Sequence, residues 1–182
     1  MKPPLVLSLQ MADARHRELL PRHQVAQWIR AALDGPAQVT VRCVDRHEAR
    51  ALNLAYRHRD YAADVLTFEY DPTPGVCADI VLCTEVVEQD ARQLRRDLKA
   101  HYVHLIVHGT LHAQGMDHQR LVDEKRMRLR ESQVMQALGY PDPWAPQPTR
   151  RGEGVSPRSP VRSSSRQLSP ANAKARPRTL RR

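Results

Sequence analysis

The stretch HYVHLIVHGTLHAQGMDH, residues 101–118, contains the most specific histidine pattern of the sequence and one of its longest apolar runs. Apolar residues occupy successive positions here rather than one stripe, which is typical of a helix that is buried on most sides. Gly115 follows the run, and a glycine at that place can adopt the left-handed backbone that ends a helix. We therefore expect a helix that is more buried than the others in this chain, followed by a turn.

The segments around this helix alternate between strand-like and helix-like patterns. Alternating apolar residues predict strands over 4–10, 37–44, 63–70 and 78–83, and helical spacing predicts helices over 23–33, 45–56, 84–98 and 123–138. Asp45 and Thr84 are expected to cap the helices that follow them, and Gly139 is expected to end the last one. About four strands and five helices indicate an α+β fold, a single small domain with helices packed on one roughly four-stranded mixed sheet.

Charge divides the chain into a neutral body and a basic tail. Of the 29 Lys/Arg and 20 Asp/Glu residues, ten basic and one acidic residue follow position 148, so the preceding residues carry 19 of each sign. The tail is rich in Ser, Pro and Arg, a composition typical of disordered segments. We expect a folded domain over 1–145 and a disordered tail over 146–182. The tail either attracts RNA phosphates electrostatically or is a solubilising extension without a required role.

The sequence also indicates the cellular compartment in which the protein is expected. No run approaches the roughly 18 consecutive apolar residues of a membrane span, and the N-terminal MKPPLVLSLQM lacks a small-residue cleavage site. Three cysteines, in no C-x-x-C spacing, argue for reduced thiols rather than disulfides; these are Cys43, Cys77 and Cys83. We expect a cytoplasmic protein without a membrane partner.

Three histidines of the opening stretch have the spacing of a metal site. His108 and His112 are four residues apart on one helical face, and the turn at Gly115 brings His118 back towards them. Three imidazoles hold a divalent cation and leave one coordination position open, as in catalytic rather than structural zinc sites. Nickel and copper also suit imidazole ligands, so zinc is chosen here on availability.

Two further side chains are candidates to support these ligands. His104 and His101 lie about one and two turns upstream on the same face, where one of them either supports a ligand or is a spare ligand, or both are buried histidines with partners elsewhere. Asp117 is adjacent to a candidate ligand, where it either fixes an imidazole tautomer or caps the turn at Gly115.

The pattern also differs from that of zinc peptidases in an informative way. Their long motif reads H-E-x-x-H-x-x-G-x-x-H, with the Glu as general base, whereas this chain has Gly109 at the second position. A phosphodiester is already anionic, and a metal with a guanidinium can stabilise the charge of its transition state. The missing carboxylate therefore favours phosphoryl chemistry. Arg57, between a predicted helix and strand, is the candidate cation or a surface residue that stabilises the helix end.

Several segments taken together resemble the YbeY family, bacterial metal-dependent endoribonucleases that mature ribosomal RNA. The resemblance covers roughly residues 5–144 and rests on NLAYRHRD, DVLTF, ADIVLC, HGTLHAQGMDH and LGYPDP. It implies a small α+β domain with a four-stranded sheet. It also implies that His108, His112 and His118 are zinc ligands, and that Arg57 is catalytic or binds the scissile phosphate.

The sequence departs from the family pattern at several positions. Ala62 and Ala63 replace Pro-Thr before the D-V-L-S-F segment, in which Thr67 replaces Ser, and Ala78 and Met116 replace a Gly and a Tyr. None of these changes removes a candidate ligand. We expect those in the loop and strand to affect substrate preference and turnover rather than metal binding.

The resemblance implies an endoribonuclease that cleaves single-stranded RNA through a metal-bound hydroxide, near the 3′ end of precursor 16S rRNA and in ribosome quality control. Whether the nucleophile is metal-bound water or the RNA 2′-hydroxyl stays open. The implied partners are ribosomal RNA, the small ribosomal subunit and its assembly factors, and no DNA. Two alternatives remain. One is a zinc metallopeptidase or amidase, which Gly109 argues against. The other is a non-enzymatic assembly factor with a structural metal, which the lack of a fourth ligand argues against.

Overall fold

A mixed four-stranded sheet and five α-helices make up the part of the chain that the structure describes. The computed structural model describes residues 3–70, 75–116 and 120–145, which belong to one compact unit. The elements are β1 (Leu5–Met11), the 3₁₀ turn η1 (Arg17–Leu19), α1 (Arg22–Ala32), β2 (Ala37–Val44), α2 (Arg46–Arg57), β3 (Val65–Glu69), β4 (Val76–Cys83), α3 (Thr84–Gln93), α4 (Leu98–His112) and α5 (Leu121–Ala137). The predicted α+β class, with its mixed sheet and five helices, is confirmed for these residues.

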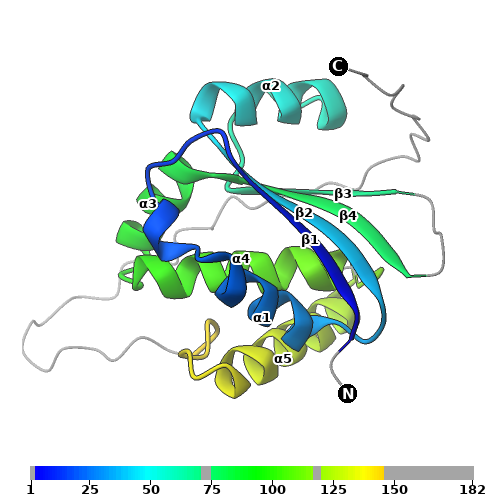
Figure 1. Ribbon diagram of the computed structural model, residues 1–182. Helices are drawn as coiled ribbons and strands as arrows, with labels where there is room; N and C mark the ends of the chain where they lie inside the picture. Colours follow the sequence, from blue (N-terminus) through cyan, green and yellow to red (C-terminus); the bar gives the residue numbers. More distant parts are fainter. Residues whose placement is uncertain (1–2, 71–74, 117–119, 146–182) are drawn as a thin grey trace, which may run out of the picture. The chain divides into compact units, whose positions relative to one another are not determined.

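The strand order is β1-β2-β4-β3, with β1, β2 and β4 parallel and β3 antiparallel at one edge (Figure 1). Helix α1 connects the first two parallel strands, and α2 with β3 lies between β2 and β4 along the chain. The two faces of the sheet are covered differently, since α2 lies on one side and α1, α4 and α5 lie on the other (Figure 1).

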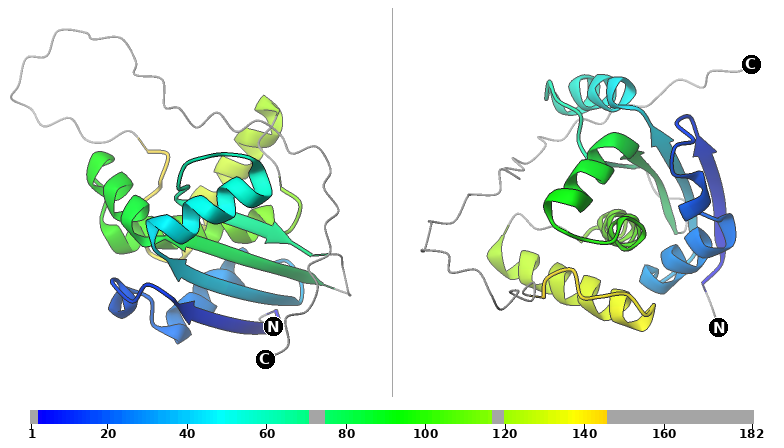
Figure 2. Two further views of the ribbon diagram at one scale, coloured as in Figure 1. Left: turned by 90° about the horizontal axis from the view of Figure 1, so that it is seen from above. Right: turned by 90° about the vertical axis from the view of Figure 1, so that its left-hand side faces the viewer.

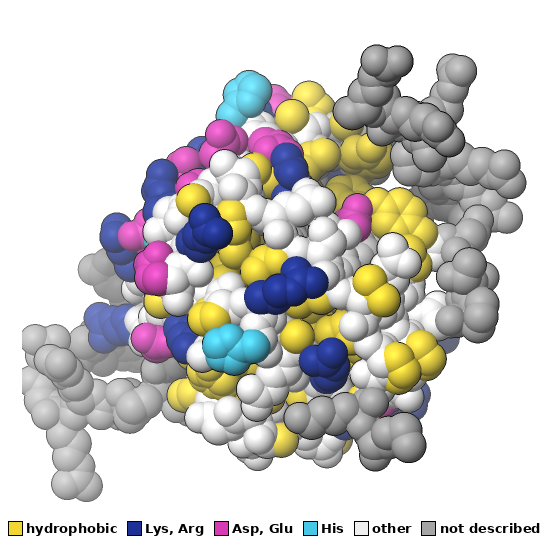
Figure 3. Space-filling model, in the orientation of Figure 1, with side chains coloured by type: hydrophobic (Ala, Val, Ile, Leu, Met, Phe, Trp, Pro, Cys, Tyr) yellow, Lys and Arg dark blue, Asp and Glu magenta, His cyan; other side chains and the backbone are white. Residues whose placement is uncertain are grey.

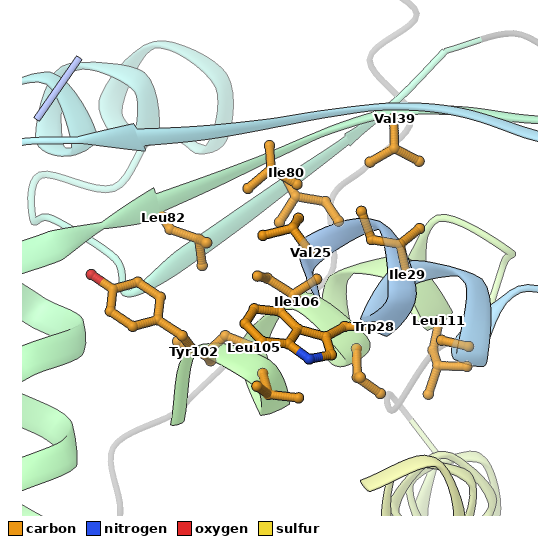
Figure 4. Close-up of a cluster of buried hydrophobic side chains, with 14 of the residues drawn as sticks. Val25, Trp28, Ile29, Val39, Ile80, Leu82, Tyr102, Leu105, Ile106 and Leu111 are labelled. Carbon is orange, nitrogen blue, oxygen red and sulfur yellow. The ribbon is translucent and has the colours of Figure 1, made fainter. Parts of the chain in front are cut away.

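Side chains of each strand alternate between these two faces. Val39, Ile80 and Leu82 belong to the larger core, where they pack with side chains of α1 and α4 (Figure 4). The intervening Leu66 and Val81 belong to a smaller core, which includes residues of α2. The candidate metal-binding helix and the helix that ends at Arg57 are therefore separated by the sheet.

Helix α4 is the central helix of the fold. It is enclosed by the sheet, α1, α3 and α5, as Figure 2 shows where the helix is viewed along its axis. Every residue from His101 to Val107 is buried, and Tyr102 and Ile106 are completely so. Its N-terminus is capped by Asp97, whose Oδ2 accepts the Ala100 N–H at 2.9 Å. A helix buried on most sides needs no polar face, which explains its largely apolar sequence.

Two predicted helix caps have different outcomes. Asp45 caps α2 as expected, because its Oδ1 accepts the Glu48 N–H at 2.8 Å. The predicted cap at Thr84 is wrong, since the Thr84 hydroxyl donates to Asp13 Oδ2 at 2.5 Å and joins the loop after β1. The predicted helix over 84–98 is also too long. It ends at Gln93, and Arg95 has a left-handed backbone (φ 51°) before α4 begins.

Charged side chains of both signs mix on the surface over α3 and the start of α2 (Figure 3). Arg46 lies 3.2 Å from Glu85, and Arg15 lies 3.8 Å from Glu88. Exposed pairs of this kind contribute little stability individually, but they are consistent with a charge-balanced body.

No helix in the described ranges is long and apolar enough to cross a membrane. The predicted basic tail, residues 146–182, lies outside the described residues.

Candidate metal centre

The rings of His108 and His112 lie side by side at the C-terminal end of α4. Their centroids are 4.5 Å apart and their planes meet at 79°. Both side chains are partly exposed, whereas the preceding turns of the helix are buried. The i, i+4 spacing therefore presents two imidazoles together at the accessible end of the central helix.

The chain turns directly after these histidines, as the sequence predicts. Gly115 has a left-handed backbone (φ 81°), and its N–H donates to the His112 carbonyl at 2.8 Å. The Met116 N–H donates to the Leu111 carbonyl at 3.2 Å and satisfies a further helix-terminal acceptor. The third candidate ligand, His118, and the candidate supporting residue Asp117 lie outside the described residues.

A buried carboxylate from α5 lies behind His108. Glu131 Oε1 is 2.6 Å from His108 Nδ1, and Glu131 Oε2 is 3.2 Å from His104 Nε2 and 2.7 Å from the Trp144 indole nitrogen. The Glu131 side chain is only 1% exposed. Both of its oxygens therefore have partners inside the protein, and one partner is a candidate metal ligand.

Two opposing effects act on the ionisation of Glu131. Burial alone raises the pKa of this carboxyl group, but the hydrogen bonds from His104 and His108 outweigh burial, and the net effect is a lowered pKa. The indole N–H of Trp144 can only donate, so the oxygen that it contacts must accept. Glu131 therefore lies in the site as a carboxylate.

Glu131 and Trp144 were not predicted as site residues from the sequence. One signal was present: Glu131 occurs on the buried face of α5, together with Met127, Val134 and Met135. A glutamate on an otherwise apolar face needs a buried partner. The identity of that partner could not be read from the spacing, because it lies on another helix.

His104 and His101 take different positions relative to the candidate ligands. His104 contacts Glu131, so it is linked to His108 through a shared carboxylate, and the two rings are 6.2 Å apart. Burial first, and then His104 and Arg96, lower the pKa of His101 to about 4. His101 is thus a neutral residue of the core.

Arg57 is the last residue of α2, and its side chain is exposed. Partial burial lowers the pKa of Arg57, and Tyr61 and Asp64 oppose that shift, so the guanidinium stays charged at neutral pH. Helices α2 and α4 pack on opposite faces of the sheet, and both contact its strands β3 and β4. A phosphate that contacts both Arg57 and the histidines would have to lie beyond an edge or an end of the sheet.

Comparison with known proteins gives the family of this chain. Residues 8–139 match the family described as "Endoribonuclease YbeY". A protein named Endoribonuclease YbeY from Methylibium petroleiphilum is 58% identical over 144 residues, which cover 79% of this chain and 97% of that protein. The chain belongs to the YbeY family.

Two other comparisons extend this result. Endoribonuclease YbeY from Verminephrobacter eiseniae is 52% identical over 149 residues, which cover 80% of this chain and 97% of that protein. The solution structure of TM1509 from Thermotoga maritima covers 78% of this chain and all of that chain, with a TM-score of 0.50 and 21% identity. At this identity the likeness concerns the fold alone. The matched range includes every candidate site residue named from the sequence, as well as Glu131, whereas Trp144 follows it.

The donor set of this YbeY chain fits a divalent transition metal. Neutral imidazole is a ligand for zinc, copper and nickel. Metal-bound histidines commonly donate their other ring N–H to a carboxylate, the position that Glu131 occupies behind His108. Within the described ranges, no group of three or more His, Cys, Asp or Glu side chains meets the geometry of a complete site.

Proposed function

We propose that this YbeY protein is a metal-dependent endoribonuclease that cleaves single-stranded RNA. In this proposal His108, His112 and His118 hold a zinc ion, and other divalent transition metals can replace it. The observation that carries the proposal is the pair of adjacent imidazoles, 4.5 Å apart, with a buried carboxylate 2.6 Å behind one of them.

The chemistry follows from these side chains. A divalent metal held by these histidines would supply a Lewis acid and would lower the pKa of a bound water towards neutrality. Arg57 binds the phosphate through its planar guanidinium, which can donate two parallel hydrogen bonds. The nucleophile is that water or the RNA 2′-hydroxyl, and the two routes leave different product ends.

The proposed cellular substrate is precursor 16S rRNA near its 3′ end, with a second role in ribosome quality control. Family membership and the shared name of the relatives, Endoribonuclease YbeY, support an RNA substrate. The proposed partners are ribosomal RNA, the small ribosomal subunit and its assembly factors, in the cytoplasm.

Peptide or amide hydrolysis is disfavoured by the environment of position 109. A Cβ atom on Gly109 would lie 3.1 Å from both Thr67 Oγ1 and Ile80 Cγ2, so this position faces the sheet. The glutamate that serves as the base of zinc peptidases has no room there. A purely structural metal is disfavoured by the partial exposure of His108 and His112, since an accessible site suits a substrate.

The test is cleavage of labelled single-stranded RNA, including the 3′ region of precursor 16S rRNA, with and without a chelator. Chelation and His112→Ala should each abolish cleavage. Zinc added after chelation should restore cleavage by the wild type but should not restore cleavage by His112→Ala. His23→Ala is the matched control, because His23 is exposed on α1. End-group analysis of the products distinguishes a 5′-phosphate from a cyclic phosphate, and thus the two nucleophiles. Cleavage by metal-free protein, or by His112→Ala, would refute the proposal.

A further inference from the structure

Near the candidate metal centre, the Glu131 side chain has partners at both carboxylate oxygens, yet the proposed reaction does not use it. Glu131 is buried, and its two oxygens contact His104, His108 and Trp144. We propose that Glu131 is a positioning residue, which selects the metal-binding tautomer of His108, and that the Trp144 indole fixes Glu131 in the required orientation. This inference rests on the proposed metal site.

The contacts determine which atoms donate. The Trp144 Nε1–H donates to Glu131 Oε2 at 2.7 Å, and an indole nitrogen cannot accept a hydrogen bond. The 2.6 Å separation between His108 Nδ1 and Glu131 Oε1 is short, as expected for a hydrogen bond to an ionised acceptor. A carboxylate accepts only, so His108 must carry its proton on Nδ1.

The position of that proton decides whether His108 can bind a metal. A neutral imidazole that is protonated on Nδ1 has its lone pair on Nε2, on the opposite side of the ring. If the carboxylate were replaced by a group that donates, Nδ1 would accept and the proton would move to Nε2. Glu131 therefore acts on the metal through His108, without touching the metal itself.

The turn after α5 holds Trp144 against this carboxylate. Ser132 Oγ donates to Asp142 Oδ1 at 2.7 Å, and the same oxygen accepts the Trp144 backbone N–H at 2.9 Å. The Arg96 guanidinium donates to the Pro143 carbonyl, and the Arg128 guanidinium lies 4.3 Å from the indole centroid. Side chains from α5 and from the loop before α4 thus fix the indole, and its N–H has one defined direction.

His104 completes the surroundings of the carboxylate. Its Nε2 lies 3.2 Å from Glu131 Oε2, and its ring packs edge-to-face on Trp144, with centroids 5.6 Å apart. The role that the sequence suggested for His104, support of a ligand, is therefore exerted through Glu131. Loss of the carboxylate would leave two imidazoles and an indole N–H facing a buried space without their hydrogen-bond acceptor. That loss would destabilise the present orientation of all three rings.

The inference is tested by zinc affinity, measured by competition with a chromophoric chelator on the full-length, metal-free protein. Glu131→Gln keeps the side-chain volume but can donate to His108, and should weaken zinc binding about 10–100-fold. Trp144→Phe keeps an aromatic ring beside Arg128 and His104 but removes the N–H, and should weaken binding less than Glu131→Gln. Glu18→Gln is the control, because Glu18 is an exposed glutamate in η1 and contacts none of the residues named here.

A second measurement does not need metal. Nitrogen-15 chemical shifts of the histidine rings should report the Nδ1–H tautomer of His108 in the metal-free wild type and a shift towards Nε2–H in Glu131→Gln. Trp144→Phe retains the carboxylate and should keep the Nδ1–H tautomer, so its zinc affinity provides the test if Glu131→Gln does not fold. Zinc affinity equal to wild type in both variants, with an unchanged tautomer in Glu131→Gln, would overturn the role of Glu131 and leave the proposed function intact. Failure of the wild type itself to bind zinc would overturn both.

Discussion

Gly109 on α4 faces Thr67 on β3 so closely that a Cβ atom on the glycine would lie 3.1 Å from the threonine hydroxyl oxygen. Ile80 on β4 closes the same space, with its Cγ2 and Cδ1 at 3.1 and 3.2 Å from that Cβ position. Position 109 thus packs against the sheet, whereas His108 contacts Glu131 of α5, and His108 and His112 are both partly exposed. The glycine between the two histidines is where the central helix approaches the edge of the sheet.

This close approach predicts that Gly109→Glu is strongly destabilising. The side chain must displace Thr67 and Ile80 and would place a charge in the core, so the free energy of unfolding should fall by at least about 3 kcal/mol. Urea denaturation measures the difference. Gly35→Glu is the matched control, because no atom lies within 4 Å of a Cβ at that position. Its cost should stay within about 1 kcal/mol. Equal stability of the two variants would show that helix α4 does not pack on the sheet in this way.

Arg57→Ala should lower the rate of RNA cleavage about 100-fold, the typical effect of removing one donor to a developing negative charge. Zinc affinity should not change, since Arg57 is on α2 and the candidate ligands are on α4 and beyond. Arg57→Lys should recover only part of the rate, because an ammonium group cannot donate in the bidentate geometry of a guanidinium.

The control for Arg57 is Arg50→Ala, on the same helix. Arg50 pairs with Asp60 at 2.6 Å on the exposed surface, so its loss should leave the cleavage rate near that of the wild type. If both alanine variants retained full activity, Arg57 would serve only as a basic residue that favours the C-terminal end of α2.

The sequence predicted the features that depend on neighbouring residues. The strand Ala37–Val44 has the predicted bounds, Asp45 caps α2, and Gly115 turns the chain after His112, since each depends on a local pattern. Features that depend on distant partners were not predictable. Thr84 resembles a helix cap, but its hydroxyl bonds to Asp13, 71 residues away. Glu131 is 23 residues from His108, and only the packing of α5 on α4 brings the two together.

His101 should make the stability of the metal-free protein depend on pH. Its pKa is about 4 in the folded state against 6.5 as the reference value, because the side chain is buried. Between these values the unfolded chain binds a proton that the folded chain does not. Stability contributed by neutral His101 is therefore complete above pH 6.5 and is lost as the pH falls towards 4, by about 3 kcal/mol in total.

The measurement is the free energy of unfolding between pH 4.5 and 7, with chelator present, for wild type and His101→Phe. The variant has no titrating group at this position, so its stability should fall less steeply with decreasing pH, whatever its absolute value. His23→Gln, on the surface of α1, controls for removal of a histidine. Identical slopes for wild type and His101→Phe would show that His101 is not buried in solution.

Deletion of residues 146–182 should weaken RNA binding at low salt and flatten its salt dependence, without reducing the cleavage rate of bound RNA. The deleted segment contains ten Lys/Arg and one Glu, and each phosphate contact to single-stranded RNA contributes about −0.7 to the slope of log affinity against log salt. The cut must follow Ala145, because a shorter chain would remove Trp144 and its hydrogen bond to Glu131. A full-length variant with Gln at the ten basic positions separates charge from length and should match the truncation. If both variants bind RNA as the wild type does at low salt, the tail is an extension with no part in RNA binding.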